Sequence, residues 1–334
     1  MATDDAHNEM GQGTLSTLEL RCPPLPQTLT EALDIMHSPE RMEVRPVTEM
    51  VERDPGVVAR LLQTVNSAYY GLQRSVSSTR RAVVMLGPVA VTGLVVGMNM
   101  LKLRSIIDGP ARDAFIRLIR HNIGVAYLTR HIFTTLAPRS SSSEEDMSDP
   151  LTAGLLHDFG KIILVYNFPD EAIALYEGGE LASQVHHPNE RVMEQLVFGY
   201  DHTEAGEFTA RKLNFPEPLT DVIRLHHDVN ALEAQTEQSR LFRAVTAANL
   251  AAKAMGHAFS EELSWDEALE HPVWALLLDY DLPNLVDVND LKEALQVEKQ
   301  RLDAYVTHMS VSASDAAADE ADSPYPPLGR AAEQ

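Results

Sequence analysis

The sequence predicts an all-α fold, a multi-helical bundle built in two parts. Apolar residues recur at helical spacing along most of the chain, for example in the segment 57–65. Helix-start signals precede several such segments, because Asp54-Pro55 and Asp149-Pro150 each place a capping side chain before a proline. No stretch shows the sustained alternation of apolar and polar residues that is typical of a half-buried strand.

The expected helices follow one another with short breaks. Gly256 supplies a natural stop after one of them, and the polar, serine-rich and acidic segment 137–150 is expected to be a loop. We expect helices within residues 23–36, 54–70, 78–86, 88–103, 111–136, 150–168, 199–213, 216–227, 239–256 and 265–306.

Two parts and two tails follow from this pattern. The polar segment 1–16 and the acidic, low-complexity segment 310–334 are expected to be disordered, because neither can bury an apolar face. The first helical part covers about 17–108 and the second about 109–230. The helices of 231–309 either complete the second part or extend it.

Composition excludes several classes of protein. The 334 residues carry a formal net charge of −22 and a pI of about 4.9, so the surface repels phosphate backbones and no nucleic-acid partner is expected. The single cysteine, Cys22, cannot form an internal disulfide, which fits a reducing compartment. The first residues lack the basic and apolar regions of a signal peptide, so we expect a cytoplasmic protein.

One apolar run, 82–101, is long enough to span a membrane and carries no charge. Gly87-Pro88 should divide it into two helices, and Asn99 places a polar group within it. We therefore expect a buried pair of core helices and no membrane contact.

Five histidines and one aspartate from four separate helices are placed toward apolar interiors. A single inward histidine is usually a core residue with its own hydrogen bonds. Burying the whole set costs several kcal/mol unless each group finds a partner, and a divalent cation is a partner that imidazole and carboxylate share. The predicted metal ligands are His121, His157, Asp158, His202, His226 and His227.

Several motifs carry a family resemblance. They are "PPLPQTL", "DPGVVARLLQTVNSAYYG", "RRAVVMLG", "LLHDFGK" and "FGYDHTEAGEFTARKLNFPEPLTDVIRLHH". Together these motifs closely resemble the HDOD family, a bacterial regulatory branch of the HD superfamily of metal-dependent phosphohydrolases. The resemblance implies an HDOD domain at 17–230, with an N-terminal helical subdomain packed on an HD-like helical half. It also implies signal transduction through a protein partner, sometimes alongside nucleotide or cyclic-dinucleotide signalling.

The resemblance also implies a ligand set and a departure from it. The six predicted ligands match the phosphohydrolase pattern, and Asn249 is a seventh predicted ligand, at a position where active relatives carry an aspartate. An amide oxygen is a poorer ligand than a carboxylate and does not offset the charge of a metal ion. We therefore expect a retained pocket for iron, manganese or a similar divalent ion, with weak or no hydrolysis.

Other polar residues have simpler interpretations. Lys161 either contacts a phosphate near the metal or is a surface lysine at a helix end. Asp54 is expected to be a helix cap, and Asn66 to hydrogen-bond to backbone between helices. The pair His186-His187 precedes a proline and is expected on a surface loop.

Two functions remain open. The first is a regulatory module without catalysis, which acts through a signalling protein partner. The alternative is a metal-dependent phosphohydrolase or cyclic-dinucleotide phosphodiesterase, in which the ion would activate a water molecule. The ligand set supports the alternative, and Asn249 favours the first.

Overall fold

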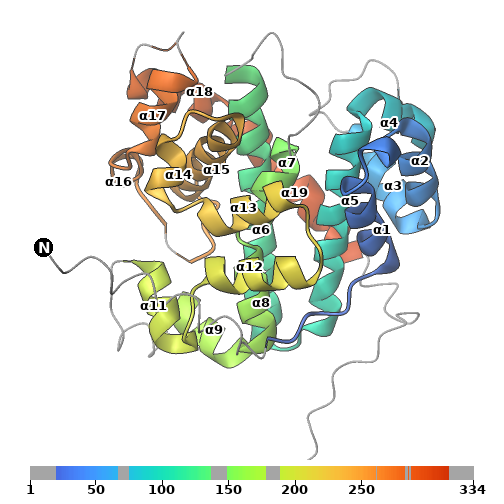
Figure 1. Cartoon of the computed structure of the whole chain (residues 1–334), viewed down its shortest axis with the longest axis horizontal. Helices are drawn as coiled ribbons and strands as arrows, with labels where there is room; N and C mark the ends of the chain where they lie inside the picture. Colours follow the sequence, from blue (N-terminus) through green and yellow to red (C-terminus); the bar gives the residue numbers. More distant parts are fainter. Residues whose placement is uncertain are drawn as a thin grey trace, which may run out of the picture.

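The computed structural model describes residues 20–66, 75–136, 149–177, 189–260, 262–282, 285 and 287–315. Every regular element within these ranges is a helix, which confirms the predicted all-α fold. Figure 1 shows a blue-to-teal N-terminal bundle on one side, α6 running through the middle, and the later helices packed around α6.

The N-terminal bundle is built from five α-helices. Asp54 caps α3 by accepting hydrogen bonds from the amides of Gly56 and Val57, as predicted. Ser78 caps α4 in the same way. The helices are α1 (Gln27–Met36), α2 (Val44–Glu52), α3 (Pro55–Val65), α4 (Thr79–Leu86) and α5 (Pro88–Lys102), with short 3₁₀ turns at Pro39–Arg41 and Leu103–Ile106.

The apolar run 82–101 is divided between α4 and α5, as predicted. Gly87 separates the two helices with a φ of 85°, a conformation that suits glycine. The segment Pro88–Ile106 is long and apolar enough to cross a membrane, but it is 65% buried inside the protein. Asn99 within it is also buried, and its Oδ1 accepts a hydrogen bond from Thr28.

The central part contains the helices that carry most of the predicted ligands. α6 continues into a π-helical turn at Ile132–Leu136. The helices of this central part are α6 (Pro110–His131), α7 (Pro150–Leu156), α8 (Phe159–Asn167), α9 (Pro169–Tyr176), α11 (Glu190–Phe198), α12 (His202–Lys212) and α13 (Glu217–Leu225).

The remaining helices pack on the same centre. α15 contacts α6, α7 and α13, and α19 contacts α6. α19 continues to Asp315, past the predicted start of the tail at residue 310. These helices are α14 (Val229–Glu233), α15 (Glu237–Ala254), α16 (Trp265–Leu269), α17 (Val273–Tyr280), α18 (Val288–Val297) and α19 (Lys299–Asp315).

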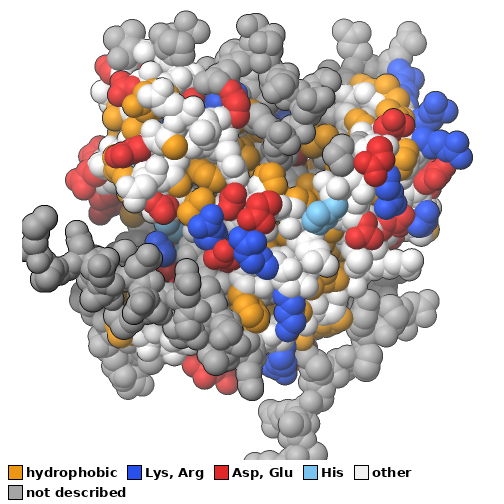
Figure 2. Space-filling model, viewed as in Figure 1, with side chains coloured by type: hydrophobic (Ala, Val, Ile, Leu, Met, Phe, Trp, Pro, Cys, Tyr) orange, Lys and Arg blue, Asp and Glu red, His pale blue; other side chains and the backbone are white. Residues whose placement is uncertain are grey.

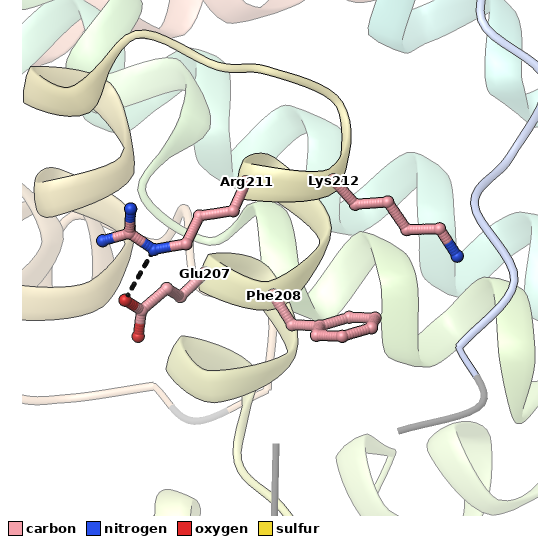
Figure 3. Close-up of a pocket in the computed structure, with 4 residues that line it drawn as sticks. All are labelled: Glu207, Phe208, Arg211 and Lys212. Carbon is pink, nitrogen blue, oxygen red and sulfur yellow. Dashed lines mark hydrogen bonds and ion pairs between the residues drawn. The ribbon is translucent and has the colours of Figure 1, made fainter. Parts of the chain in front are cut away.

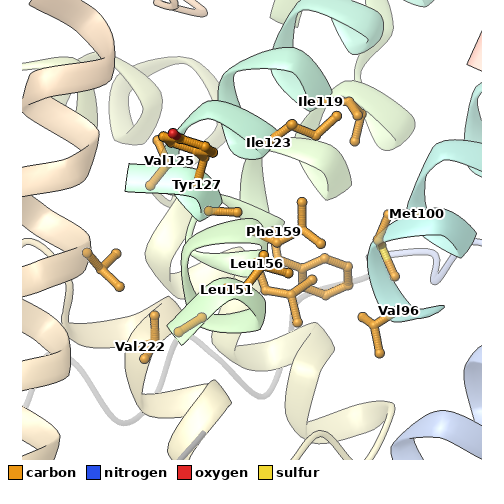
Figure 4. Close-up of a cluster of buried hydrophobic side chains, with 14 of the residues drawn as sticks. Val96, Met100, Ile119, Ile123, Val125, Tyr127, Leu151, Leu156, Phe159 and Val222 are labelled. Atoms are coloured by element: carbon orange, nitrogen blue, oxygen red, sulfur yellow. The ribbon is translucent and has the colours of Figure 1, made fainter. Parts of the chain in front are cut away.

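One hydrophobic core joins the N-terminal bundle to the centre. Figure 4 shows Val96 and Met100 of α5 facing Leu156 and Phe159. Helix α5 packs closely on α7 at Gly93, where an added Cβ would lie 1.7 Å from the side-chain Oγ1 of Thr152.

Candidate metal centre

The predicted ligands lie mostly at helix ends. His202 is the first residue of α12, and His226 directly follows α13. His157 and Asp158 lie in a break between α7 and α8, so the prediction of one continuous helix over 150–168 is wrong. The break turns both side chains toward the same centre, which two adjacent positions in an unbroken helix would do less well.

The ligand side chains converge on Asp158. Its Oδ1 lies 3.4 Å from His202 Nε2 and 3.6 Å from His226 Nε2. Its Oδ2 lies 3.4 Å from His157 Nε2 and 3.7 Å from His121 Nε2. His227 lies beside this set, with its ring centroid 4.1 Å from that of His226. All six predicted histidine and aspartate ligands therefore belong to one cluster.

Four of the histidines are oriented through Nδ1. The Nδ1 of His121 lies 2.7 Å from the carbonyl oxygen of His257, and that of His157 lies 2.8 Å from the carbonyl oxygen of Gly154. His226 Nδ1 lies 3.1 Å from the carbonyl oxygen of Val222. A carbonyl oxygen only accepts, so these three Nδ1 atoms donate and each Nε2 keeps its lone pair for a ligand.

His202 has a charged partner in place of a carbonyl. Its Nδ1 lies 2.6 Å from Glu194 Oε2, and its backbone amide donates to the same oxygen. Glu194 Oε1 in turn accepts a hydrogen bond from the Tyr176 hydroxyl. A carboxylate behind a histidine ligand fixes the ring and makes Nε2 a stronger donor to a metal ion.

The inward-facing atoms of the cluster lack hydrogen-bond partners. These atoms are the Nε2 of His121, His157, His202, His226 and His227 and both carboxylate oxygens of Asp158, although Oδ2 forms an ion pair with Lys161 Nζ. Oδ1 of Asn249, on α15, is also buried without a hydrogen-bond partner. Buried polar atoms are seldom left unsatisfied, because each one costs about 1–3 kcal/mol. A divalent cation would satisfy several of them at once, so the residues present fit a metal ion.

Two groups of ligand atoms within 4.8 Å of one another could each hold an ion. One group is Asp158 with His202, His226 and His227, and the other is Asp158 with His121 and His157. Asp158 belongs to both groups. The arrangement has the shape of a site in which one carboxylate borders two cation positions.

The electrostatics keep most of these histidines in the form that binds metals. Burial lowers the pKa of His121 to about 4, and it lowers the pKa values of His157, His226 and His227 below their ordinary value as well. Burial acts in the same direction on His202, but attraction to Glu194 outweighs it and raises that pKa. At neutral pH, the first four are neutral imidazoles.

Lys161 is not the surface residue that one interpretation expected. It is 1% exposed, and its Nζ lies 3.0 Å from Asp158 Oδ2 and 2.8 Å from Glu190 Oε2. The Glu190 side chain also accepts a hydrogen bond from Ser260. The ammonium group is therefore part of the cluster.

Sequence reasoning missed the carboxylates of α11. Glu190 and Glu194 lie one helical turn apart, and Val197 follows on the same side of the helix. Two acidic residues on a stripe that also carries an apolar residue are a signal of inward charge. That signal is present in the sequence.

The remaining predicted residues have structural roles or lie elsewhere. Asn66 hydrogen-bonds to backbone at both Leu62 and Val76, as predicted. Asn249 lies on α15 and is 5% exposed. The pair His186-His187 lies outside the described residues.

A surface pocket of 360 Å³ lies on the outer side of α12 and is separate from the cluster. Figure 3 shows Glu207, Phe208, Arg211 and Lys212 lining it. Arg211 already pairs with Glu207 and Glu217. The inner side of the same helix carries His202, so the pocket does not open on the candidate metal ligands.

Comparison with known families supplies one match over most of the chain. The family model of the HDOD domain matches residues 22–229. A curated protein from Treponema pallidum (strain Nichols), named only as uncharacterised, is 25% identical over 228 residues. That alignment covers 68% of this chain and 41% of the relative, so this chain spans about two fifths of the relative's length.

Solved structures share the fold. An HDOD domain protein of unknown function from Geobacter sulfurreducens has a TM-score of 0.64 at 20% identity, over 88% of this chain and 93% of its own. A protein from Marinobacter aquaeolei VT8, provisionally named a signal transduction protein, has a TM-score of 0.60 at 20% identity. The match covers 89% of this chain and 64% of that protein. A protein from Shewanella amazonensis SB2B, provisionally named a metal-dependent phosphohydrolase, has a TM-score of 0.60 at 17% identity. The match covers 90% of this chain and 95% of that protein. These identities establish the common fold and nothing further.

Proposed function

Because the chain belongs to the HDOD family, we propose that it is a regulatory module that acts through a protein partner and holds a divalent metal ion in its helical centre. The observation that carries the proposal is the convergence of unsatisfied Nε2 atoms on a carboxylate that is 0% exposed. A bound ion would neutralise buried charge and tie together the helices that supply its ligands.

Enclosure of the centre favours regulation over hydrolysis. The side chains of His121, His157, Asp158, His202 and His226 are all 0% exposed. His227 is the one predicted ligand that is partly exposed. A phosphodiester substrate needs an open coordination position beside the ion, and the other five ligands supply none. Asn249 adds to this argument, because it places a neutral amide where active relatives have a carboxylate.

The N-terminal bundle offers a surface suited to a partner. Residues 55–107 contain no Asp or Glu, although the whole chain has a net charge of −22. Three of its large apolar side chains are exposed on α4 and the start of α5, namely Val84 at 60%, Met85 at 44% and Val89 at 38%. Figure 2 shows basic side chains at the right-hand edge, over the N-terminal helices, interspersed with acidic and apolar ones. Such a surface suits an acidic protein partner.

The alternative function is a metal-dependent phosphohydrolase or cyclic-dinucleotide phosphodiesterase. The number of ligand side chains favours it, since two groups sharing Asp158 resemble the two-ion sites of phosphatases. In that case the ion would lower the pKa of a bound water molecule, and Lys161 would steady a phosphate group.

Metal content and hydrolysis together test the proposal. We expect stoichiometric metal in freshly purified protein by elemental analysis, and its loss in Asp158→Ala. We expect no turnover of a generic phosphodiester or of a cyclic dinucleotide that depends on Asp158. Turnover in the wild type that disappears in Asp158→Ala would establish the alternative, and absence of metal would refute both.

A crosslinking experiment tests the partner surface. A photoreactive amino acid at position 85 should crosslink one protein of defined mass in the cells that express the chain. The same group at position 297 is the control, because Val297 is an apolar side chain that is 76% exposed on α18. Equal labelling at both positions would contradict a partner site on α4.

A further inference from the structure

The exposed face of α4 carries two positive charges that no described acidic group neutralises. Arg80 and Arg81 are both exposed, and neither forms an ion pair with any residue that the structure describes. Val84 and Met85 lie one helical turn further along the same face and are 60% and 44% exposed. This face of α4 therefore combines basic charge with apolar surface.

The neighbouring sequence and helices leave that charge in place. Residues 55–107 contain six basic residues and no acidic one. Acidic side chains do lie on α1 and α2, but Glu49 pairs with Arg45 and Glu31 pairs with Arg53. The two arginines of α4 are therefore available to an acidic group from elsewhere.

The segment 316–334 has the complementary composition. It carries four acidic residues and one basic residue, and it also contains the apolar residues Tyr325 and Leu328. Three of the acidic residues lie close together, namely Asp319, Glu320 and Asp322. A compact acidic group of this kind attracts a pair of arginines.

The end of α19 brings this segment to the N-terminal bundle. The hydroxyl of Thr64, on α3, donates a hydrogen bond to Met309 Sδ at 3.5 Å, and α3 packs on α4. Helix α19 ends at Asp315, and nineteen residues follow it. An extended chain of that length spans about 60 Å, whereas α3 is only about 16 Å long. The segment can therefore reach the exposed face of α4.

Two other acidic segments lie outside the described residues, 1–19 and 137–148. The first joins the described chain beside Arg21, whose backbone is hydrogen-bonded to the Asn167 side chain at the end of α8. The second lies between α6 and α7. Both are attached to the central helices, whereas α19 ends near a contact with the bundle itself.

Resting on the partner surface of the proposed function, we propose that the segment 316–334 binds the exposed face of α4 in its own chain and competes there with the acidic partner. Its acidic group pairs with Arg80 and Arg81, and its apolar residues lie against Val84 and Met85. Attachment to the same chain keeps its local concentration on the order of millimolar, so a weak contact suffices. Exposed ion pairs add little to the free energy of unfolding, so the contact controls access to α4 and not folding.

Crosslinking in the purified full chain tests the contact. A photoreactive amino acid at position 85 should crosslink to residues within 316–330, located by fragment-ion mass spectrometry after digestion with trypsin. A mixture of ¹⁵N-labelled and unlabelled chains should give crosslinks within one isotope only, because the segment binds its own chain. The same group at position 297, on α18, is the control and should not label 316–330.

Charge variants of the full chain test its origin. Arg80→Ser with Arg81→Ser should lower the crosslink yield at least about threefold, and so should a rise in salt from about 0.05 M to about 0.5 M. The matched control is Arg211→Ser with Lys212→Ser, which removes two adjacent exposed basic residues from α12. That control should keep the wild-type yield.

Partner labelling in cells tests the competition. The triple variant Asp319→Asn, Glu320→Gln and Asp322→Asn keeps the full chain and removes the acidic group. A segment that covers α4 for about two thirds of the time lowers the apparent affinity of a partner about threefold. Labelling of the partner from position 85 should therefore rise about threefold in the triple variant at limiting partner.

The outcomes separate this proposal from the proposed function. Absence of a crosslink to 316–330, crosslinks between the two isotopes, or crosslinks to 1–19 or 137–148 in its place would overturn the contact. Unchanged partner labelling in the triple variant would overturn the competition and leave the partner surface standing. Absence of partner labelling in both chains would refute the partner surface itself, whatever the purified chain shows.

Discussion

Gly160 lies directly against the backbone of His202. A Cβ added at Gly160 would fall 1.6 Å from the carbonyl oxygen of His202, so α8 and α12 meet without a side chain between them. We expect Gly160→Ala to lower the free energy of unfolding by at least about 3 kcal/mol, at or beyond the upper end of ordinary overpacking, because backbone has to move. Chemical denaturation measures this change.

Gly124 provides the matched control for that substitution. It also lies within a helix, but its added Cβ would have its nearest contact at 3.5 Å, from His257. Gly124→Ala should therefore be neutral or stabilising by up to about 1 kcal/mol. Equal effects of the two substitutions would show that α8 and α12 are not in the contact described.

Removal of metal should destabilise the protein. An ion at 100 times its dissociation constant stabilises the folded state by about 2.7 kcal/mol. We therefore expect a chelator to lower the melting temperature by about 4 °C, measured by calorimetry. Asp158→Ala is the control and should not respond to the chelator, because it has no ion to lose. An unchanged wild-type melting temperature would indicate an empty centre.

The metal-free protein should lose stability as the pH falls. The pKa of His121 is about 4 in the folded chain and 6.5 ordinarily, so the unfolded chain binds more protons between these values. The free energy of unfolding then falls on acidification by up to about 1.4 kcal/mol per pH unit for this group. His157, His226 and His227 act in the same direction, and His202 opposes them.

Denaturation curves between pH 7.5 and pH 4.5 measure that slope. His121→Ala should give a shallower dependence than the wild type, since one of the groups that takes up a proton is gone. His37→Ala is the control, because His37 is exposed and remote from the cluster. Parallel curves for all three proteins would contradict the burial of a neutral His121.

Glu194 should control metal affinity without touching the ion. Glu194→Gln keeps the size of the side chain but replaces the charge behind His202 Nδ1 with an amide. We expect the affinity for Mn²⁺ to fall by about 10–100-fold while the helical circular dichroism is kept. Glu207→Gln, at a partly exposed glutamate on the outer side of α12, should change the affinity little. The same loss in both variants would argue for a general effect of charge.

The end of the chain should be dispensable beyond α19. Removal of 316–334 should leave the melting temperature and its cooperativity unchanged, because every described contact is kept. Removal of 299–334 should be severely destabilising, because it deletes Leu302, Tyr305, Val306 and Met309 from the core. Broadened unfolding after the shorter truncation would show that the tail contributes to the fold.

The helices and most of the centre could be predicted from sequence, because local rules govern them. Asp54 and Asp149 cap helices where the sequence places them, and the inward histidines follow from helical spacing. The burial of Lys161 could not be predicted, since it depends on Glu190 arriving from α11. The break at His157-Asp158 was missed for a related reason. Its apolar flanks have helical periodicity, which gives no sign of a stop.

Two residues of the histidine centre have hydrogen-bond partners that lie beyond the segment matched by the family model. The hydroxyl of Thr246 donates a hydrogen bond to the backbone carbonyl oxygen of His226, and Nδ1 of His121 donates to the carbonyl oxygen of His257. Both partners lie downstream of residue 229, where the family match ends. An expression fragment trimmed to that match would leave the His121 ring without its Nδ1 partner and the His226 carbonyl without the Thr246 hydroxyl. Work on isolated fragments of this chain should begin from a boundary at residue 315.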